Sequence, residues 1–136
     1  MNVVLLSISL IFQISTLYGG DCEKVKNPKP PKAWMSVELA EGYTVARLKG
    51  KAVDDNGDPI ANAWVEIIKI STSGKGKVVY VCKTRKSGNY QFPNLKSGRY
   101  EVRVSAEGYD QTTVRIVVSE HSQTNPEVLV PMKASN

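Results

Sequence analysis

The sequence predicts an all-β domain, a sandwich or barrel of about seven short strands. Runs rich in Val, Ile, Tyr and Trp recur after residue 40, and these residue types favour strands over helices. Clusters of Gly, Asn, Asp, Ser and Pro separate the runs, as chain reversals require. Between the runs, no long segment has apolar residues at helical spacing, which argues against a parallel sheet with crossover helices.

The expected strands are short and follow one another closely along the chain. They cover residues 43–53, 63–70, 78–84, 90–92, 98–106, 112–118 and 127–131. The alternation is clearest where Tyr100, Val102 and Val104 alternate with charged residues, because such a strand has one buried and one hydrated face. We expect these apolar side chains to fill the core. For residues 35–42 the pattern leaves open a short helical turn or an irregular lead-in.

The N-terminal segment indicates export. Residues 1–20 contain no Lys, Arg, Asp or Glu, and the apolar part, 3–12, has the length of the central region of a signal peptide. A signal peptide is the first interpretation and an uncleaved N-terminal anchor is the alternative. Residues 21–42 begin with prolines interleaved with lysines and are expected to be a stiff, solvated tether and lead-in. The sandwich follows at 43–133, in a secreted or periplasmic protein without a transmembrane span after signal removal.

The chain has two cysteines, Cys22 and Cys82. In an exported protein they are able to form one disulfide, which would tie the tether to the sandwich. The alternative is a small buried strand residue at Cys82 and a thiol at Cys22, because two distant cysteines carry no spacing signature.

Two stretches of the chain carry a recognisable order of turn and strand residues. In residues 50–65 a Gly and an apolar residue precede an Asp, a Gly turn, Pro59-Ile60 and an alternating strand. The second stretch has aromatic and glycine residues in order at Gly88, Tyr90, Phe92, Leu95, Gly98, Tyr100, Gly108 and Tyr109. Over about 47–131 the chain thus resembles the carboxypeptidase regulatory-like domain family. Arg85 and Ser97 depart from the usual family residues, which changes turn chemistry more than core packing.

The resemblance implies a seven-stranded Greek-key β-sandwich of prealbumin-like topology. It also implies an accessory module of the kind that usually carries no active site. Fold is implied much better than function, because function depends on a site and not on the fold alone.

The residues themselves offer little for catalysis or metal binding. The single histidine, His121, lies in a polar loop, and the sequence has neither a Gly-x-Ser-x-Gly elbow nor a Cys/His pairing context. One His and two distant Cys are a poor supply of zinc ligands. The acidic segment 54–58 resembles a calcium loop, but Pro59 follows it and no bidentate Glu closes it, so a turn is the better interpretation. We therefore predict no enzyme, no catalytic residue, no cofactor and no metal.

Two features are candidates for a binding surface. Basic side chains surround one predicted hairpin, at Lys75, Lys77, Lys83 and Arg85. They form either a patch for an anionic partner or a solvated edge whose lysines discourage strand pairing. Trp64 lies on the strand face opposite Val65, where it would stack on a sugar or anchor a protein. The alternative is that the N-terminal segment with Trp34 covers it, since Trp is highly buried on average.

These observations favour a non-catalytic exported module that acts in binding or as a structural spacer. Its partner would be a protein or glycan at the cell surface or in the periplasm. The formal net charge of +5 favours anionic surfaces, whereas export argues against nucleic acid. The alternative is a small-molecule carrier or hydrolase of the transthyretin-like kind, which needs a channel between subunits or a pocket lined by His and Arg.

Overall fold

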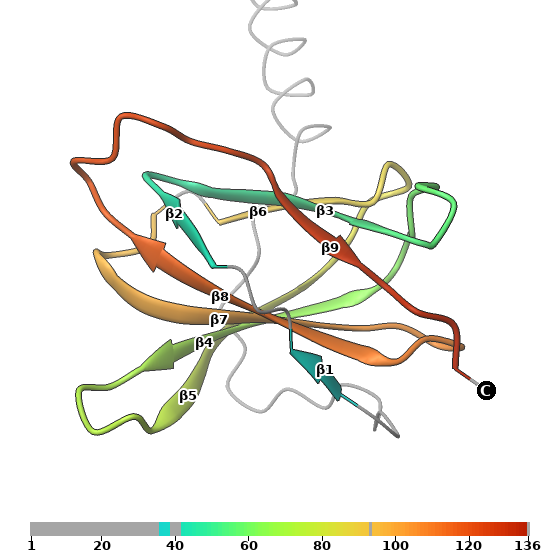
Figure 1. Ribbon diagram of the computed structural model, residues 1–136, viewed down its shortest axis with the longest axis horizontal. Coiled ribbons are helices and arrows are strands. Elements are labelled where there is room, and N and C mark those ends of the chain that lie inside the picture. Colours follow the sequence, from blue (N-terminus) through green and yellow to red (C-terminus); the bar gives the residue numbers. More distant parts are fainter. Residues whose placement is uncertain (1–35, 39–41, 93, 136) are drawn as a thin grey trace, which may run out of the picture.

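The computed structural model describes residues 36–38, 42–92 and 94–135. The predictions for the signal peptide, the first part of the tether, Cys22 and Trp34 therefore lie outside the described residues. Nine strands and no helix are found in the described part, and they form two sheets packed face to face (Figure 1). The predicted all-β sandwich is confirmed.

The larger sheet has six strands in the order β1-β8-β7-β4-β5, with β2 also paired to β8. Their bounds are β1 Ser36–Glu38, β2 Tyr43–Val45, β4 Trp64–Ile70, β5 Gly76–Lys83, β7 Gly98–Ser105 and β8 Gln111–Val118. The pairs β4–β5, β4–β7 and β7–β8 are antiparallel. Both β1 and β2 run parallel to β8, one beside each half of that strand.

The smaller sheet has three strands in the order β6-β3-β9. These are β3 Leu48–Val53, β6 Asn89–Phe92 and β9 Val128–Pro131. β3 is antiparallel to β6 and parallel to β9. The chain thus crosses between the sheets before and after each of the hairpins β4–β5 and β7–β8 (Figure 1). β5 and β1–β2 are left as the edges of the larger sheet.

The strand expected at 43–53 is in fact two strands in different sheets. The chain bends at Ala46 and Arg47, whose backbone N–H groups both donate to Asn125 Oδ1 at 3.1 and 2.9 Å. β2 then joins β8, while β3 joins β6 and β9. The lead-in contributes the short strand β1. These two differences raise the number of strands from the seven predicted to the nine described.

The core lies between the sheets and consists of the alternating apolar residues. Val65 and Ile67 on β4 face Val102 and Val104 on β7 in register, and all four side chains are fully buried. The opposite layer supplies mainly Leu48, Ala52, Tyr90, Phe92, Val128 and Val130. Each large side chain buried in this way stabilises the fold by roughly 1.5–3 kcal/mol before conformational entropy is counted.

Glycine allows a close approach within the smaller sheet. Gly50 on β3 lies against the ring of Tyr90, where any Cβ would collide with the phenol and with the Val128 carbonyl. The Tyr90 hydroxyl donates to that same carbonyl at 3.2 Å. Burial raises the pKa of Tyr90 above its usual value of 10.0, so the hydroxyl remains a donor.

One end of the sandwich, which we call the turn end, is closed by hydrogen-bonded turns at 54–63 and 84–88. Thr84 joins the two turns: its Oγ1 donates to the Ile60 carbonyl at 2.6 Å and accepts from the Ala63 N–H at 2.9 Å. Gly88 has φ +76, and a Cβ there would lie 2.7 Å from the Ala52 carbonyl oxygen. The opposite end, where β4 and β8 end and β7 begins, is called the cleft end.

Candidate functional site

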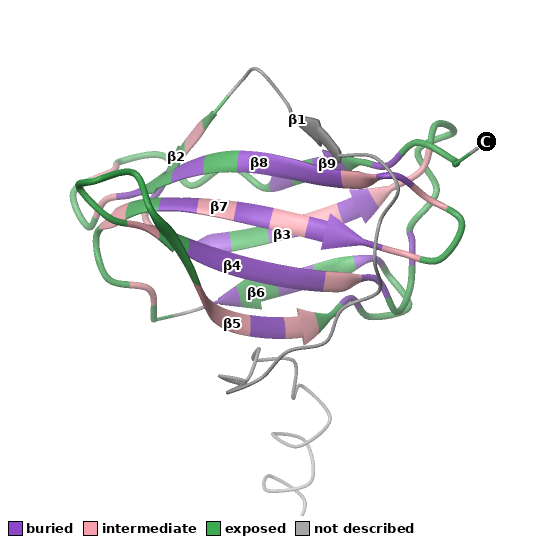
Figure 2. Cartoon of the chain, turned by 90° about the horizontal axis from the view of Figure 1, so that it is seen from below, coloured by how far each residue is buried: buried purple, intermediate pink, exposed green. Residues whose placement is uncertain are grey.

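Figure 2 shows the outer face of the six-stranded sheet, coloured by burial. This face carries a concave surface. Residues that point away from the core alternate with core residues on β4, β7 and β8. On β4 they include Glu66, Ile68 and Ile70, whose register places them beside Arg103, Glu101 and Arg99 of β7. The site is therefore built on paired strands, which hold side chains more precisely than loops do.

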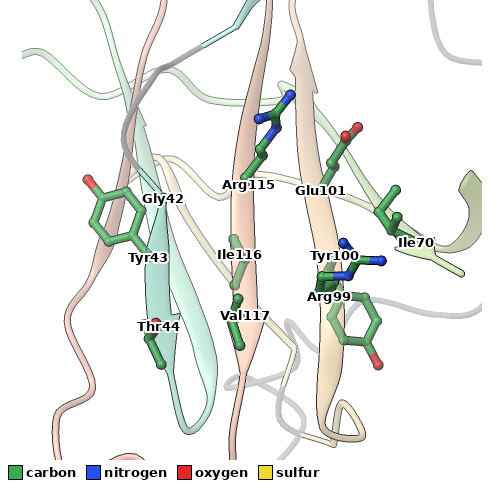
Figure 3. Close-up of a pocket in the computed structure, with 10 residues that line it drawn as sticks. All are labelled: Gly42, Tyr43, Thr44, Ile70, Arg99, Tyr100, Glu101, Arg115, Ile116 and Val117. Carbon is green, nitrogen blue, oxygen red and sulfur yellow. The ribbon is translucent and has the colours of Figure 1, made fainter. Parts of the chain in front are cut away.

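A groove of about 540 Å³ opens on this face toward the cleft end (Figure 3). Three adjacent strands supply its floor, and β2 with Gly42 supplies one wall. The lining residues are Gly42, Tyr43, Thr44, Ile70, Arg99, Tyr100, Glu101, Arg115, Ile116 and Val117. The groove thus combines backbone, apolar side chains and three charged side chains.

The charges in the groove alternate in sign across the strands. Glu101 of β7 is directly opposite Arg115 of β8, and Arg99 is opposite Val117. An opposite-charge pair at such a position contributes roughly 0.2–1 kcal/mol relative to Ala–Ala. Arg99 Nη2 donates to the Ser71 carbonyl at 3.2 Å, which holds its guanidinium beside the groove. Val117 is 43% exposed, so an apolar surface is available between the charged groups.

Near the middle of the same face lies a buried carboxylate. Glu66 is 4% exposed, and its Oε1 has no hydrogen-bond partner. Burial raises the pKa of Glu66 above the usual 4.5, while the neighbouring Arg103 partly lowers it. A buried carboxylate oxygen without a hydrogen-bond partner costs stability in the charged form, and Arg103, directly across β4 and β7, offsets part of that cost.

Trp64 and Lys83 lie at the turn end of the outer face. They are direct partners across β4 and β5, and Lys83 Nζ lies 4.7 Å from the centroid of the Trp64 ring. This cation–π contact is worth about 0.5–1 kcal/mol at an exposed site. Trp64 is half-buried, so one part of its ring is available to a partner.

The five residues predicted as a binding surface do not share one face. A β-bulge between Ile67 and Ile68 shifts the register of β4 on β5, and a bulge reverses which side the following residues occupy. Lys83 therefore shares the outer face with Trp64, whereas Lys77 is opposite Lys69. Lys75 lies in the exposed turn before β5.

Arg85 follows β5 and contributes to a different concavity. It lines a cavity of about 180 Å³ with Lys49, Asn89, Tyr90, Gln91 and Glu127, beside the three-stranded sheet. The predicted basic surface is therefore divided among the turn end of the outer face, the turn at 71–75 and the smaller sheet.

The remaining predicted residues have local explanations. Cys82 is half-buried on β5, and because Cys22 lies outside the described residues, their disulfide stays a prediction. His121 is exposed in the loop between β8 and β9. Asp54 Oδ1 accepts from the N–H groups of Asn56 and Asp58, both at 2.9 Å, as expected of a turn rather than a calcium loop. In the described ranges no group of three or more His, Cys, Asp or Glu side chains is placed to hold a metal ion.

Sequence reasoning did not find the groove. Arg99 and Glu101 were visible only as the polar half of an alternating strand, and Arg115 and Val117 likewise. Their convergence depends on the register of β7 with β8 and on the position of β2, which are long-range features. The part of the chain that is described contains no helix long and apolar enough to cross a membrane.

The model of the carboxypeptidase regulatory-like domain family matches residues 47–131, which is more than half of the chain. The chain belongs to this family. The predicted resemblance and the prealbumin-like sandwich are both confirmed.

Two solved structures that are similar to this chain share little sequence with it. Sea bream transthyretin in complex with thyroxine is similar with a TM-score of 0.52 and 12% identity, over 65% of this chain and 88% of that one. The 3-chlorocatechol 1,2-dioxygenase of Rhodococcus opacus 1CP gives a TM-score of 0.48 and 11% identity, over 93% of this chain and 78% of that one. At such identities the likeness to transthyretin concerns the fold alone.

Proposed function

We propose that this protein is an exported, non-catalytic binding module whose groove holds an extended segment of a protein partner. Export is supported by the apolar, uncharged residues 1–20 and the Pro/Lys-rich tether that follows them. The observation that carries the binding role is the groove of about 540 Å³ between β2, β7 and β8.

The chemistry of the groove favours a peptide over a sugar. Val117 and Ile70 offer apolar contacts, while Arg99 and Glu101 offer charges of both signs, so alternating side chains of an extended peptide find matching partners. Sugar rings are commonly bound by an exposed aromatic face. Tyr43, an aromatic residue of the lining, packs against the core instead.

A binding role also accounts for the kinds of side chain present. The described lining includes no His, Cys or Ser, and its one carboxylate, Glu101, lies directly opposite Arg115 across the strands, which favours its charged form over a role in proton transfer. The proposal of a non-enzyme therefore depends on the make-up of this groove together with membership of a family of accessory modules. A spacer role without a ligand remains the simplest alternative within the same class.

The test uses two exposed apolar residues on opposite sheets as a matched pair. Val117 is 43% exposed in the groove and Leu129 on β9 is 46% exposed. Peptides that bind the full chain are first selected from a random library. Their affinities for the wild type, Val117→Glu and Leu129→Glu are then measured by isothermal titration calorimetry. We expect Val117→Glu to weaken binding about tenfold or more, the effect of losing an interface anchor, and Leu129→Glu to leave it unchanged. Equal effects of both variants, or selection of no peptide at all, would contradict the proposal.

The second candidate function, suggested by the transthyretin-like fold, is a small-molecule carrier or hydrolase. That role needs a channel between subunits, and the concavity beside the three-stranded sheet is only about 180 Å³ in one chain. Light scattering separates the two candidates, because we expect a monomer, whereas a tetramer would favour the carrier.

A further inference from the structure

A second cavity lies at the cleft end, where the β6–β7 connection crosses from the smaller to the larger sheet. Its volume is about 220 Å³, and it is lined by Lys69, Val79, Tyr80, Asn94, Leu95, Lys96 and Tyr100. We call this cavity the lysine cleft. It shares only Tyr100 with the lining of the groove described above, so it is a separate concavity.

Lys69 lies on the side of β4 that faces the smaller sheet, but its side chain is exposed, because it follows the last core positions of the strand. On β4 the side chains two and four positions earlier, Ile67 and Val65, are fully buried in the core, and Lys69 continues the same alternation. Lysines on edge strands discourage aggregation, but β4 is an interior strand between β5 and β7. Edge protection therefore does not explain Lys69.

Further positive charges are placed beside it. Lys77 on β5 is the direct cross-strand partner of Lys69, and like charges at such positions are destabilising. Lys96 joins them from the lining of the cleft. Among the described residues no ion pair is found for Lys69, Lys77 or Lys96. The Glu120 N–H donates to Oγ of Ser97, the residue after Lys96, at 3.4 Å. A locally unfavourable concentration of charge of this kind is typical of a site for an anion.

The cleft is held in place by a buried tyrosine. Tyr100 is 3% exposed, and its hydroxyl donates to the Lys96 carbonyl at 2.7 Å. Burial, with a smaller effect of Tyr80, raises the pKa of Tyr100 above 10.0, so the donor persists at physiological pH. The backbone that carries Lys96 is therefore fixed before any ligand arrives, which lowers the entropic cost of binding.

We propose that the lysine cleft binds the sulfate or carboxylate groups of an acidic polysaccharide. Lys69, Lys77 and Lys96 supply the charges, and the Asn94 amide and Tyr80 hydroxyl are partners for sugar hydroxyls. The lining contains lysines but no arginine, so the charges act as points and not as the planar fork that binds a carboxylate or phosphate through two hydrogen bonds. A membrane surface is broad and flat, whereas Lys69 and Lys96 line a cavity of about 220 Å³. A sugar polymer therefore fits better than a phosphopeptide or a lipid bilayer.

The experiment measures binding of the full chain to dextran sulfate, a sulfated polymer, and to polygalacturonate, a carboxylated one. Neutral dextran and vesicles of phosphatidylserine with phosphatidylcholine serve as comparisons. The double variant Lys69→Gln/Lys96→Gln is compared with Lys86→Gln/Lys133→Gln, which removes two exposed lysines elsewhere. Circular dichroism establishes that each variant is folded.

We expect at least one acidic polymer to bind, and the cleft variant to weaken that binding about tenfold, as the loss of two charge-assisted contacts implies. The control variant should change it less than about twofold, because distant exposed charges are largely screened. Preference for the sulfated or the carboxylated polymer would identify the anionic group. Equal weakening by both variants would overturn the proposal by showing a general charge effect. Binding to the vesicles alone, or to none of the four partners, would also overturn it.

Discussion

The two ends of the sandwich are built in opposite ways. At the turn end, Thr84 Oγ1 and the backbone of 60–63 form a closed set of hydrogen bonds of 2.6–3.0 Å, and Gly88 packs against the Ala52 carbonyl without room for a side chain. At the cleft end, Lys69 and Lys77 face each other across two strands, and two cavities open. The polar groups at the turn end are hydrogen-bonded to one another, whereas the cleft end also presents exposed lysine side chains of like charge.

This difference separates stability from binding within one small domain. Buried polar groups with good partners fix a unique structure, as they do around Thr84. Unpaired like charges lower stability and are retained where they serve a ligand. Substitutions at the turn end should therefore destabilise the protein, whereas substitutions at the cleft end should change binding and leave stability equal or improved.

The largest effect is expected at Gly88. Gly88→Ala combines a positive φ of +76 with a Cβ 2.7 Å from a backbone oxygen, so we expect a loss of about 3 kcal/mol in the free energy of unfolding. The control is Gly57→Ala, with φ +81 and no atom within 4 Å of the added Cβ, for which about 1 kcal/mol is expected. Urea denaturation measures both, and equal losses would show that the packing at the turn end is unimportant.

The next effect concerns the hydroxyl that joins the turns. Thr84→Val keeps the shape of the side chain but leaves the Ala63 N–H and the Ile60 carbonyl without this partner, which costs about 2 kcal/mol. Thr72→Val, in the exposed turn of the cleft end, should stay within about 0.5 kcal/mol of the wild type. Thermal and urea unfolding measure both variants. A loss for Thr84→Val no larger than that for Thr72→Val would contradict the role given to the hydroxyl.

A smaller effect is expected at Glu66. Because burial raises its pKa in the folded state, the folded protein binds this proton more tightly than the unfolded chain does. Protonated Glu66 therefore contributes to the free energy of unfolding at low pH. This contribution is lost as the pH rises from the ordinary pKa of 4.5 through the raised pKa of the folded protein. Glu66→Gln removes this dependence and should stabilise the protein at pH 7 by about 1 kcal/mol.

The control for this pH dependence is Glu101→Gln, a half-buried carboxylate on the same sheet face. It should change the free energy of unfolding at pH 7 by less than about 0.5 kcal/mol. Unfolding curves recorded between pH 4 and 8 measure both variants. A destabilised Glu66→Gln at neutral pH would mean that the charged carboxylate has a favourable partner.

The smallest effect distinguishes the cleft end most directly from the turn end. Lys69→Leu removes one member of a like-charge pair across β4 and β5, so we expect stabilisation by about 0.5 kcal/mol. The gain should shrink as salt screens the repulsion. Lys133→Leu, in an exposed segment after β9, has no such pair and should show no salt-dependent gain. Destabilisation by Lys69→Leu would place Lys69 among the residues that hold the fold.

Local patterns were sufficient for most of the fold. The alternation of Tyr100, Val102 and Val104 predicted β7 and its buried face, and the turn clusters placed the strand ends closely. The division of 43–53 into β2 and β3 was not predictable in this way. It depends on Asn125, which lies 78–79 residues away from the two N–H groups that it binds, and no local pattern encodes such a contact.

The candidate sites were harder to predict, for two physical reasons. The bulge at Ile67 and Ile68 reverses the side on which later residues lie, so equal spacing placed Lys77 and Lys83 on one face when the register separates them. Lys69 was visible in the sequence as a lysine on the strand face that carries Val65 and Ile67. Its significance depended on knowing that β4 is an interior strand, which is a property of the sheet order and not of the strand itself.

The most direct test of the division between the two ends is the amide spectrum of the full, isotopically labelled chain during titration with dextran sulfate. The account predicts that chemical-shift changes concentrate at Lys69, Lys77, Tyr80 and Lys96, while the amides around Thr84 and Gly88 stay unchanged. Changes centred instead on Trp64, Lys83 and Arg85 would contradict it, because the turn end would then be the part of the molecule that binds.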